Sequence, residues 1–285
     1  MILVTGANGT NGRHIVQQLA GKGLKVRAMV RDLKKAASLT APNVEVAKGD
    51  FDDPVSLTAL VTGIEKAFLL TATSPHRVTQ EANFLEAAKQ TGIQHIVRLS
   101  IVGADSNSPS RLLRRHGQAE QQLADSGIPF TLLRPNYFMQ NLLWYAEDIR
   151  TRGVFLASLP EATQHSHVDA RDIAALAVVA LTETGHEHQT YHITGPEALT
   201  YGEMMQRLSR LLGRPVRYEA SPETYANSLR NWGLDANEIL ELDAYIARGV
   251  GNGAAVTDTV LRVTQRQPIQ FEQFARDHLH AFMGH

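Results

Sequence analysis

The sequence predicts an α/β fold, a doubly wound parallel sheet with a smaller, mainly helical C-terminal domain. Between Ile2 and Leu133, short runs rich in Val, Ile, Leu and Phe alternate with helix-period segments, the pattern of repeated strand–helix units. A glycine-rich turn follows the first run. After Arg134 the alternation weakens and helical patterns dominate to the end, which indicates a second domain.

The expected strands and helices follow from these runs. Strands are expected at residues 2–5, 25–30, 44–48, 66–70, 95–100 and 130–134. Helices are expected at residues 11–21, 34–40, 54–62, 78–91 and 110–126. Asp53 and Pro54 support the start of the third helix, because Asp is a favoured N-cap and Pro suits the first helical position.

Beyond Arg134 the chain carries three further recognisable elements. VDARDIAALAVVALTE is an apolar helix and TYHIT another strand. LTYGEMMQRLSRLLG predicts a helix that starts with a capping box of Thr200 and Glu203 and ends at Gly213.

The turn after the first strand carries Gly6-x-x-Gly9-x-x-Gly12 and leads into a helix. Glycine permits a tight turn and a close approach of the backbone to a pyrophosphate, and the helix N-terminus offers unpaired N–H groups. Between a first strand and a first helix, this pattern predicts a dinucleotide site. A glycine-rich turn without a ligand is the alternative.

Composition excludes several classes of function. The 285 residues have a formal net charge of -1 and no long basic block, so we expect no nucleic-acid partner. The absence of cysteine excludes disulfides, thiolate zinc sites and a cysteine nucleophile. The longest apolar run, IAALAVVAL, falls far short of the ~20 residues of a membrane helix, so we expect a cytoplasmic protein without a membrane partner.

Several segments together resemble a known family. The GxxGxxG spacing is that of short-chain dehydrogenases, and the likeness extends through MVRD, GDFDDP, LLRPNYFMQN, VDARDIA and PIQFEQFARDH. The chain resembles the NmrA-like group of atypical short-chain dehydrogenases, which includes triphenylmethane-dye and quinone reductases and also redox sensors that bind the dinucleotide without turnover. The resemblance implies a Rossmann fold of the extended short-chain type. We therefore expect a dinucleotide-binding domain at 1–150, also including 166–195, and a smaller substrate-side domain at 196–285.

The residue after the second strand predicts the cofactor. Arg31 stands where an NAD-specific protein usually carries a carboxylate, and an arginine can grip a 2′-phosphate, with Lys35 as a second cation. NADP(H) is therefore expected in preference to NAD(H), although Asp32 is adjacent and a solvated surface arginine is the alternative. The cofactor-binding candidates, some of them implied by the resemblance, are Gly6, Asn8, Gly9, Thr10, Asn11, Gly12, Arg31, Lys35, Asp50, Phe51, Leu70, Thr71 and Pro135.

The usual catalytic acid of short-chain dehydrogenases is missing, because no tyrosine has a lysine four residues later. At the corresponding helix the chain has His116 and Glu120 at the same spacing, and the dye reductases resemble it there. Glu120 could orient His116 as a modest acid, and an ordinary surface pair is the alternative. The catalytic candidates are Ser100, His116 and Glu120.

A substrate pocket is expected at PNYFMQNLLWY, which follows the carboxyl end of a strand. Its candidate residues are Asn136, Tyr137, Phe138, Met139 and Trp144, and helical core packing is the alternative for each aromatic. The histidines of the segments HSH and GHEHQTYH are candidate metal ligands. Neither segment has an obvious third ligand, so no metal is expected.

These observations predict an NADPH-dependent oxidoreductase that transfers hydride to a small aromatic, quinone-like, dye-like or iminium acceptor, because such electrophiles need little proton transfer. The first alternative is an NADP(H) sensor that regulates a protein partner. The second, a sugar-nucleotide epimerase or dehydratase, is weakened by the missing Tyr/Lys pair.

Overall fold

A computed structural model describes residues 1–247 and 253–283, and the chain forms two compact units. The first unit comprises residues 1–108, 113–134 and 170–192, and the second comprises residues 109–112, 135–169 and 193–285. The expected boundary near residue 150 differs from this division. Residues after the sixth strand belong to the second unit because Leu142 and Ile149 share a hydrophobic core with Phe271 and Phe274.

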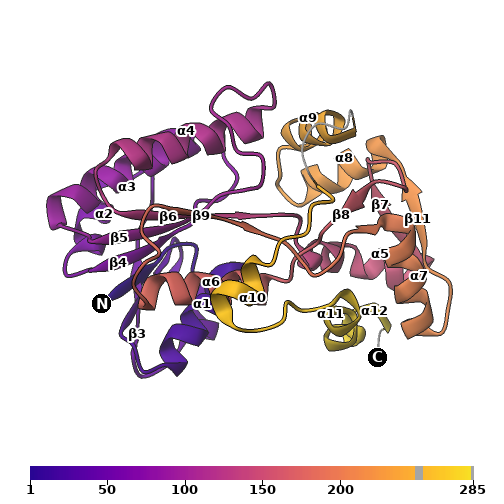
Figure 1. Cartoon of the computed structure of the whole chain (residues 1–285), viewed down its shortest axis with the longest axis horizontal. Helices are drawn as coiled ribbons and strands as arrows, with labels where there is room; N and C mark the ends of the chain where they lie inside the picture. Colours follow the sequence, from indigo (N-terminus) through magenta and orange to yellow (C-terminus); the bar gives the residue numbers. More distant parts are fainter. Residues whose placement is uncertain (248–252, 284–285) are drawn as a thin grey trace. The chain divides into compact units, whose positions relative to one another are not determined.

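The first unit is built on a seven-stranded sheet with the order β3-β2-β1-β4-β5-β6-β9 (Figure 1). Its strands are β1 (Ile2–Val4), β2 (Val26–Val30), β3 (Val44–Lys48), β4 (Lys66–Leu69), β5 (His95–Leu99), β6 (Phe130–Pro135) and β9 (Gln189–Ile193). The pairs from β3 to β6 are parallel. This confirms the doubly wound sheet, and the chain order reverses between β1 and β4, where ligands of such sheets bind.

Helices cover both faces of this sheet. Figure 1 shows α1 beside α6 on one face and α2, α3 and α4 on the other. Their bounds are α1 (Thr10–Gly21), α2 (Pro54–Val61), α3 (Arg77–Thr91), α4 (Arg111–Asp125) and α6 (Ala170–Thr182). Burial on both faces explains why apolar residues follow one another without polar alternation at Ala67–Leu69 of β4 and at Ile96 and Val97 of β5.

One expected helix is wrong. Residues 34–40 form no α-helix but two single 3-10 turns, Leu33–Lys35 and Ala37–Leu39. Leu33, Ala36 and Leu39 recur every third residue, which matches the three residues per turn of a 3-10 helix. Only the last two are buried, so the segment has too little apolar surface to hold a longer helix.

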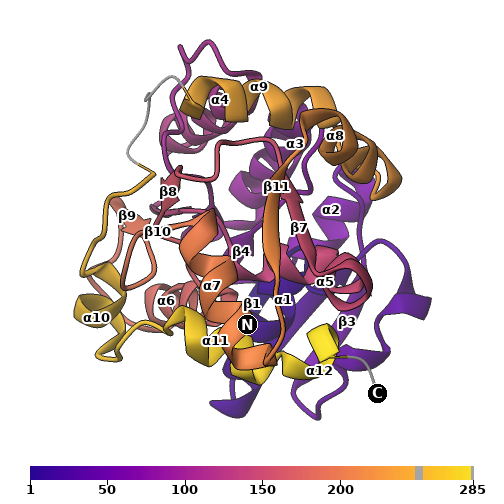
Figure 2. The same ribbon diagram turned by 90° about the vertical axis from the view of Figure 1, so that its right-hand side faces the viewer.

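The second unit combines two small strand pairs with short helices. β7 (Val154–Ala157) pairs in parallel with β11 (Arg217–Ala220), and β8 (Gln164–His165) pairs antiparallel with β10 (Leu199–Thr200). Figure 2 shows β7 and β11 side by side with α7 (Tyr201–Leu212) close to them. The other elements of this unit are η3 (Met139–Tyr145), α5 (Ala146–Arg152), α8 (Pro222–Asn231), α9 (Ala236–Ala247), α10 (Thr259–Thr264), α11 (Phe271–Asp277) and α12 (Leu279–Met283).

Local capping follows the sequence. Asp53 caps α2 by accepting from the N–H groups of Val55 and Ser56, and the capping box of Thr200 and Glu203 starts α7.

Across the parts of the chain that the structure describes, no helix has the length and apolar character that crossing a membrane requires.

A buried charge network ties α3 to the sheet. Glu81 on α3 accepts hydrogen bonds from Arg98 Nε on β5 at 2.6 Å and from Thr71 Oγ1 at 2.8 Å. Arg77 Nη1 donates to Thr71 Oγ1 at 2.8 Å. Although burial alone would raise it, the pKa of Glu81 is lowered by the two arginines and Thr71.

We expect Glu81→Gln to destabilise the first unit by about 3 to 5 kcal/mol, because the change leaves buried guanidinium groups without their counter-charge. Chemical denaturation followed by far-ultraviolet circular dichroism measures the change. Glu86→Gln on the exposed face of the same helix is the control and should alter stability by less than about 0.5 kcal/mol. Equal effects of the two variants would contradict the role given to the network.

Candidate functional site

The turn between β1 and α1 forms a backbone cradle. Gly6 has a φ of +60°, a conformation that side chains with a Cβ rarely adopt. At Gly12 a Cβ would lie 2.2 Å from Gly6 O and 2.7 Å from Ala7 Cα, so only glycine fits there. Thr5 joins the cradle to β4, because its hydroxyl accepts from Leu70 N at 2.8 Å.

The start of α1 is prepared for an anion. Its N-cap, Gly9, has no side-chain capping bond, and the first turn has no acidic residue. The Asn11 side chain is buried, and its Oδ1 has no hydrogen-bond partner. Unpaired N–H groups at a helix N-terminus beside a glycine turn fit a dinucleotide pyrophosphate, whereas Asn11 Oδ1 is an acceptor and fits a hydroxyl or N–H donor of the same cofactor. Asn8 and Thr10 lie in the same turn.

The end of β2 presents the predicted cations. Arg31 and Lys35 are exposed, and Arg31 makes no side-chain hydrogen bond or ion pair within residues 1–247 and 253–283. The neighbouring Asp32 caps the first 3-10 turn, where it accepts from Lys34 N at 3.0 Å. The Asp32 carboxylate, whose negative charge would repel a 2′-phosphate, therefore has a local structural role as a helix cap.

The predicted adenine-side pair follows β3. Asp50 Oδ1 accepts from Asp52 N at 3.0 Å, and this bond orders the turn. Phe51 packs 6.1 Å from the ring of Phe84 and is half-buried. Both residues lie in the first unit with the cradle.

Ser100, His116 and Glu120 are brought together in the first unit and are buried. The Ser100 hydroxyl donates a short hydrogen bond to Glu120 Oε1 and lies 3.5 Å from His116 Nδ1. Arg134 holds both oxygens of Glu120, with Nε at 2.9 Å from Oε1. A surface i, i+4 pair is therefore the wrong interpretation of His116 and Glu120.

The connections within this cluster differ from those expected from the helix spacing. The Glu120 side chain binds Ser100 and Arg134, and no hydrogen bond joins it to the His116 side chain in the described part of the chain. Burial, followed by the charges of Arg77 and Arg98, lowers the pKa of His116 well below its usual value. His116 is therefore neutral near pH 7, and the expected orientation by Glu120 is replaced by contact with Ser100.

Arg134 is a member of this cluster that sequence reasoning missed. It lies 14 residues from Glu120, so no helical spacing joins the pair, and it reaches the carboxylate from β6. The signal that could have found it is a charged residue within an otherwise apolar strand, because such a residue usually has a buried partner.

The predicted substrate segment lies in the second unit and has mixed environments. Asn136 and Met139 are buried, and the Asn136 amide donates to Ser166 Oγ and Gly253 O at 2.7 Å each. Phe138 is half-buried. Trp144 is 46% exposed and packs edge-on against Trp232. Asn136 and Met139 already make structural contacts within the second unit. The aromatic side chains of the segment are therefore the better candidates for lining a substrate pocket.

The half-buried Tyr137 packs against a cluster of buried histidine and tyrosine rings. Its ring lies 4.6 Å from that of His165, and its hydroxyl donates to Asp243 at 2.9 Å. His167 and Tyr201 complete the cluster. Burial lowers the pKa of His165 to about 4 and that of His167 to about 3. Neither His165 ring nitrogen has a hydrogen-bond partner.

The HSH motif does not assemble a metal centre with other ligands. Within residues 1–247 and 253–283, no three histidine or acidic side chains lie close enough to hold a metal ion. The pattern instead places two neutral imidazoles in an apolar core.

Comparison with known proteins shows which proteins this chain is similar to. The model of the NmrA-like family matches residues 1–254. The chain is 41% identical over 286 residues to an NAD(P)H azoreductase of Xenophilus azovorans, with 99% of each chain covered.

Two solved structures are similar over nearly their whole length. An NADPH-dependent quinone oxidoreductase from Escherichia coli, complexed with NADPH, is 28% identical with a TM-score of 0.84, covering 98% of this chain and 100% of that one. The triphenylmethane reductase of Citrobacter sp., complexed with NADP(H), is 26% identical with a TM-score of 0.83, covering 97% and 99%.

The buried histidines make the second unit sensitive to acid. Their folded pKa values lie below the unfolded value of 6.5, so the unfolded chain takes up protons first as the pH falls. We expect the free energy of unfolding to decrease from about pH 6.5 towards pH 4, by up to about 1.4 kcal/mol per pH unit for each histidine.

Tryptophan fluorescence during chemical denaturation tests this, because both tryptophans, Trp144 and Trp232, lie in the second unit. His165→Gln should flatten the pH dependence, whereas His76→Gln, at an exposed position of the first unit, should leave it unchanged. A pH dependence that is the same in all three proteins would contradict the assignment.

Proposed function

The chain belongs to the NmrA-like family, and from this membership we propose that it is an NADPH-dependent reductase of flat, activated electrophiles. The observation that carries the proposal is the cradle of the first unit, where the Gly6–Gly12 approach, the uncapped start of α1 and Asn11 fit a dinucleotide. The relatives named as azoreductase, quinone oxidoreductase and dye reductase support hydride transfer as the chemistry.

The bound cofactor would supply the hydride, and the chain's own residues bind and orient it. The cradle would hold the pyrophosphate, and Arg31 with Lys35 would bind the 2′-phosphate. Asp50 and Phe51 would flank the adenine. Leu70 and Thr71 follow β4 and Pro135 is the last residue of β6, and the nicotinamide would lie at such strand ends. The Thr71 hydroxyl is already fixed by Glu81 and Arg77, so a contact from its backbone is favoured.

Ser100 is the group proposed to meet the negative charge that hydride transfer leaves on a quinone or azo acceptor. Its single O–H donates to Glu120, which Arg134 holds, so the hydroxyl would turn from Glu120 to the acceptor to donate to it. His116 is neutral and so a poor acid, and no tyrosine carries a lysine at i+4. Such a site favours quinones, azo compounds and triarylmethyl cations over ketones and alcohols, which need stronger proton transfer.

The second unit would supply the acceptor site. Tyr137, Phe138 and Trp144 offer aromatic surface for a flat substrate. The proposal assigns them this role because the segment directly follows β6.

The first prediction of this proposal concerns cofactor choice. Arg31→Ala should weaken NADPH binding about tenfold to a hundredfold and leave NADH binding nearly unchanged, because it removes one charge-assisted contact worth about 1.5 to 3 kcal/mol. Titration of both cofactors by fluorescence or calorimetry measures this. Lys22→Ala, just beyond the opposite end of α1, is the matched control for loss of one charge. Equal loss for NADPH and NADH would remove Arg31 from the 2′-phosphate site.

The second prediction concerns turnover. Addition of a quinone or an azo dye should cause saturable oxidation of NADPH, whereas short secondary alcohols and ketones should be poor substrates. Ser100→Ala should lower kcat by about a hundredfold, the scale of losing one hydrogen-bond donor to a developing negative charge, and change NADPH affinity little. Ser228→Ala, on a half-buried serine of α8 in the second unit whose hydroxyl bonds to Thr224 O of the same helix, is the control. Tight NADPH binding without oxidation by any acceptor would contradict the reductase and favour the sensor.

A further inference from the structure

Asp243 on α9 is a buried carboxylate that the cofactor and substrate candidates do not include. It is 4% exposed. Its Oδ1 accepts a hydrogen bond from the Tyr137 hydroxyl at 2.9 Å, and its Oδ2 accepts a short hydrogen bond from the Ser158 hydroxyl. Burial raises the pKa of Asp243, whereas the two hydroxyl donors lower it, so both hydroxyls stabilise the charged carboxylate. A charged acceptor binds a hydroxyl more strongly than a neutral one.

The Tyr137 residue is held at both ends. At the backbone, its carbonyl accepts from Val168 N at 2.9 Å, and its N–H donates to Asn136 Oδ1 at 2.8 Å. At the far end of the side chain, the hydroxyl is held by Asp243. Between these ends the ring packs against His165, with ring centroids 4.6 Å apart. Tyr137 is only half-buried, so the residue stays accessible from solvent although its orientation is fixed.

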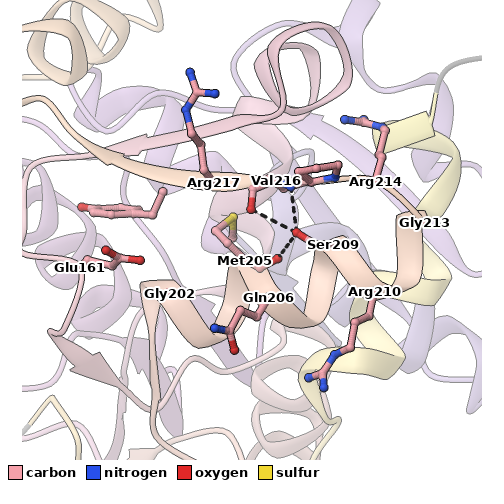
Figure 3. Close-up of a pocket in the computed structure, with 12 residues that line it drawn as sticks. Glu161, Gly202, Met205, Gln206, Ser209, Arg210, Gly213, Arg214, Val216 and Arg217 are labelled. Atoms are coloured by element: carbon pink, nitrogen blue, oxygen red, sulfur yellow. Dashed lines mark hydrogen bonds between the residues drawn. The ribbon is translucent and has the colours of Figure 1, made fainter.

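The histidine next to Tyr137 packs against a fixed wall. Tyr201 of α7 lies 5.7 Å from the His165 ring and stacks on Tyr218 of β11 with ring centroids 4.9 Å apart. The Ser209 hydroxyl of α7 accepts from Val216 N at 2.8 Å, which joins the helix to the residue before β11 (Figure 3). The rings that support Tyr137 are therefore preformed, and a preformed surface loses less entropy when a ligand binds.

The same contacts make the Tyr137 hydroxyl unsuited to acid catalysis. Its single O–H already donates to Asp243. Burial, followed by the negative charge of Asp243, raises the pKa of Tyr137 well above its usual value. The part of Tyr137 that can serve a flat acceptor is therefore its ring.

We propose that Asp243 is a positioning residue of the acceptor site, which holds the Tyr137 ring in the orientation that stacks on a flat acceptor. The inference rests on the proposed reductase function and adds a basis for specificity to it. Stacking grows with the ring area that two partners share, so two-ring acceptors should depend on the bond between Asp243 and Tyr137 more than one-ring acceptors do.

Steady-state oxidation of NADPH by 1,4-naphthoquinone and by 1,4-benzoquinone tests the proposal. Tyr137→Phe keeps the ring and removes the bond to Asp243. It should raise KM for 1,4-naphthoquinone about fivefold, the scale of one aromatic contact, and change kcat and the KM for 1,4-benzoquinone by less than about twofold. Each ratio compares a variant with the unmodified chain for one quinone, so the different reduction potentials of the quinones cancel.

Three further variants separate positioning from a structural role. Asp243→Leu should act like Tyr137→Phe, because it also removes the bond. Asp243→Asn keeps an acceptor oxygen for the Tyr137 hydroxyl and should hold KM within about twofold of the unmodified chain. Ser158→Ala is the matched control, because it removes the other hydroxyl from the same carboxylate and leaves the bond to Tyr137, so KM should stay unchanged.

Several results would overturn the proposal. An equal rise of KM in Ser158→Ala and Tyr137→Phe would show a structural role of the carboxylate, and a rise in Asp243→Asn as large as in Asp243→Leu would show that charge matters and not the bond. An unchanged KM for 1,4-naphthoquinone in Tyr137→Phe would exclude positioning while the reductase stands. If Asp243→Leu does not fold, the comparison of Tyr137→Phe with Ser158→Ala gives the same decision.

Failure of the reductase proposal has a different signature, because the unmodified chain would then oxidise NADPH with neither quinone. Binding of 1,4-naphthoquinone, followed by quenching of the Trp144 and Trp232 fluorescence, would still decide the role of Asp243 in that case. Tighter binding by the unmodified chain than by Tyr137→Phe supports the positioned ring, and equal binding excludes it.

Discussion

The structure of the first unit depends on the contact between Gly12 and the carbonyl of Gly6. A Cβ at position 12 would overlap that carbonyl, so the helix can start this close to the strand end only with glycine. The close approach directs the N–H groups at the start of α1 to the carboxyl end of β1, next to the reversal of strand order between β1 and β4. One steric constraint thus places the positive end of a helix dipole where the sheet leaves room for a ligand.

The neighbouring strands add side chains to the same edge. Thr5 links the end of β1 to the chain after β4, and Ser100 follows β5. Next to Ser100, Glu120 and Arg134 form a partly buried ion pair, and removal of Arg134 would leave the buried Glu120 carboxylate without its counter-charge. The cluster therefore combines a directed hydroxyl with a neutral histidine, a poor arrangement for strong acid catalysis. That limit agrees with an oxidoreductase whose relatives are named for readily reduced acceptors.

The second unit contains a cluster of packed histidine and tyrosine rings, in contrast to the ion pairs of the first unit. His165, His167, Tyr137 and Tyr201 pack as rings, and their polar atoms have few partners. Burial keeps both histidines neutral, since charging either would need a desolvated cation. Asp243 ends this cluster, where it accepts from Tyr137, and burial raises its pKa. Burial thus favours the uncharged forms of His165, His167 and Asp243 in this cluster.

The sequence by itself determined the elements whose causes are local. Apolar runs located the six strands expected before Arg134 and the TYHIT strand after it, and Asp53 and Thr200 marked helix starts because a cap acts within three residues. The glycine spacing likewise determined the cradle. Tertiary structure decided which charges meet. Glu120 pairs with Arg134, and not with the His116 that its spacing suggested, because strand and helix packing brings together residues that no local period connects. It also decided the division of the chain and the neutral state of the histidines, since burial depends on contacts from distant segments that a linear pattern does not contain.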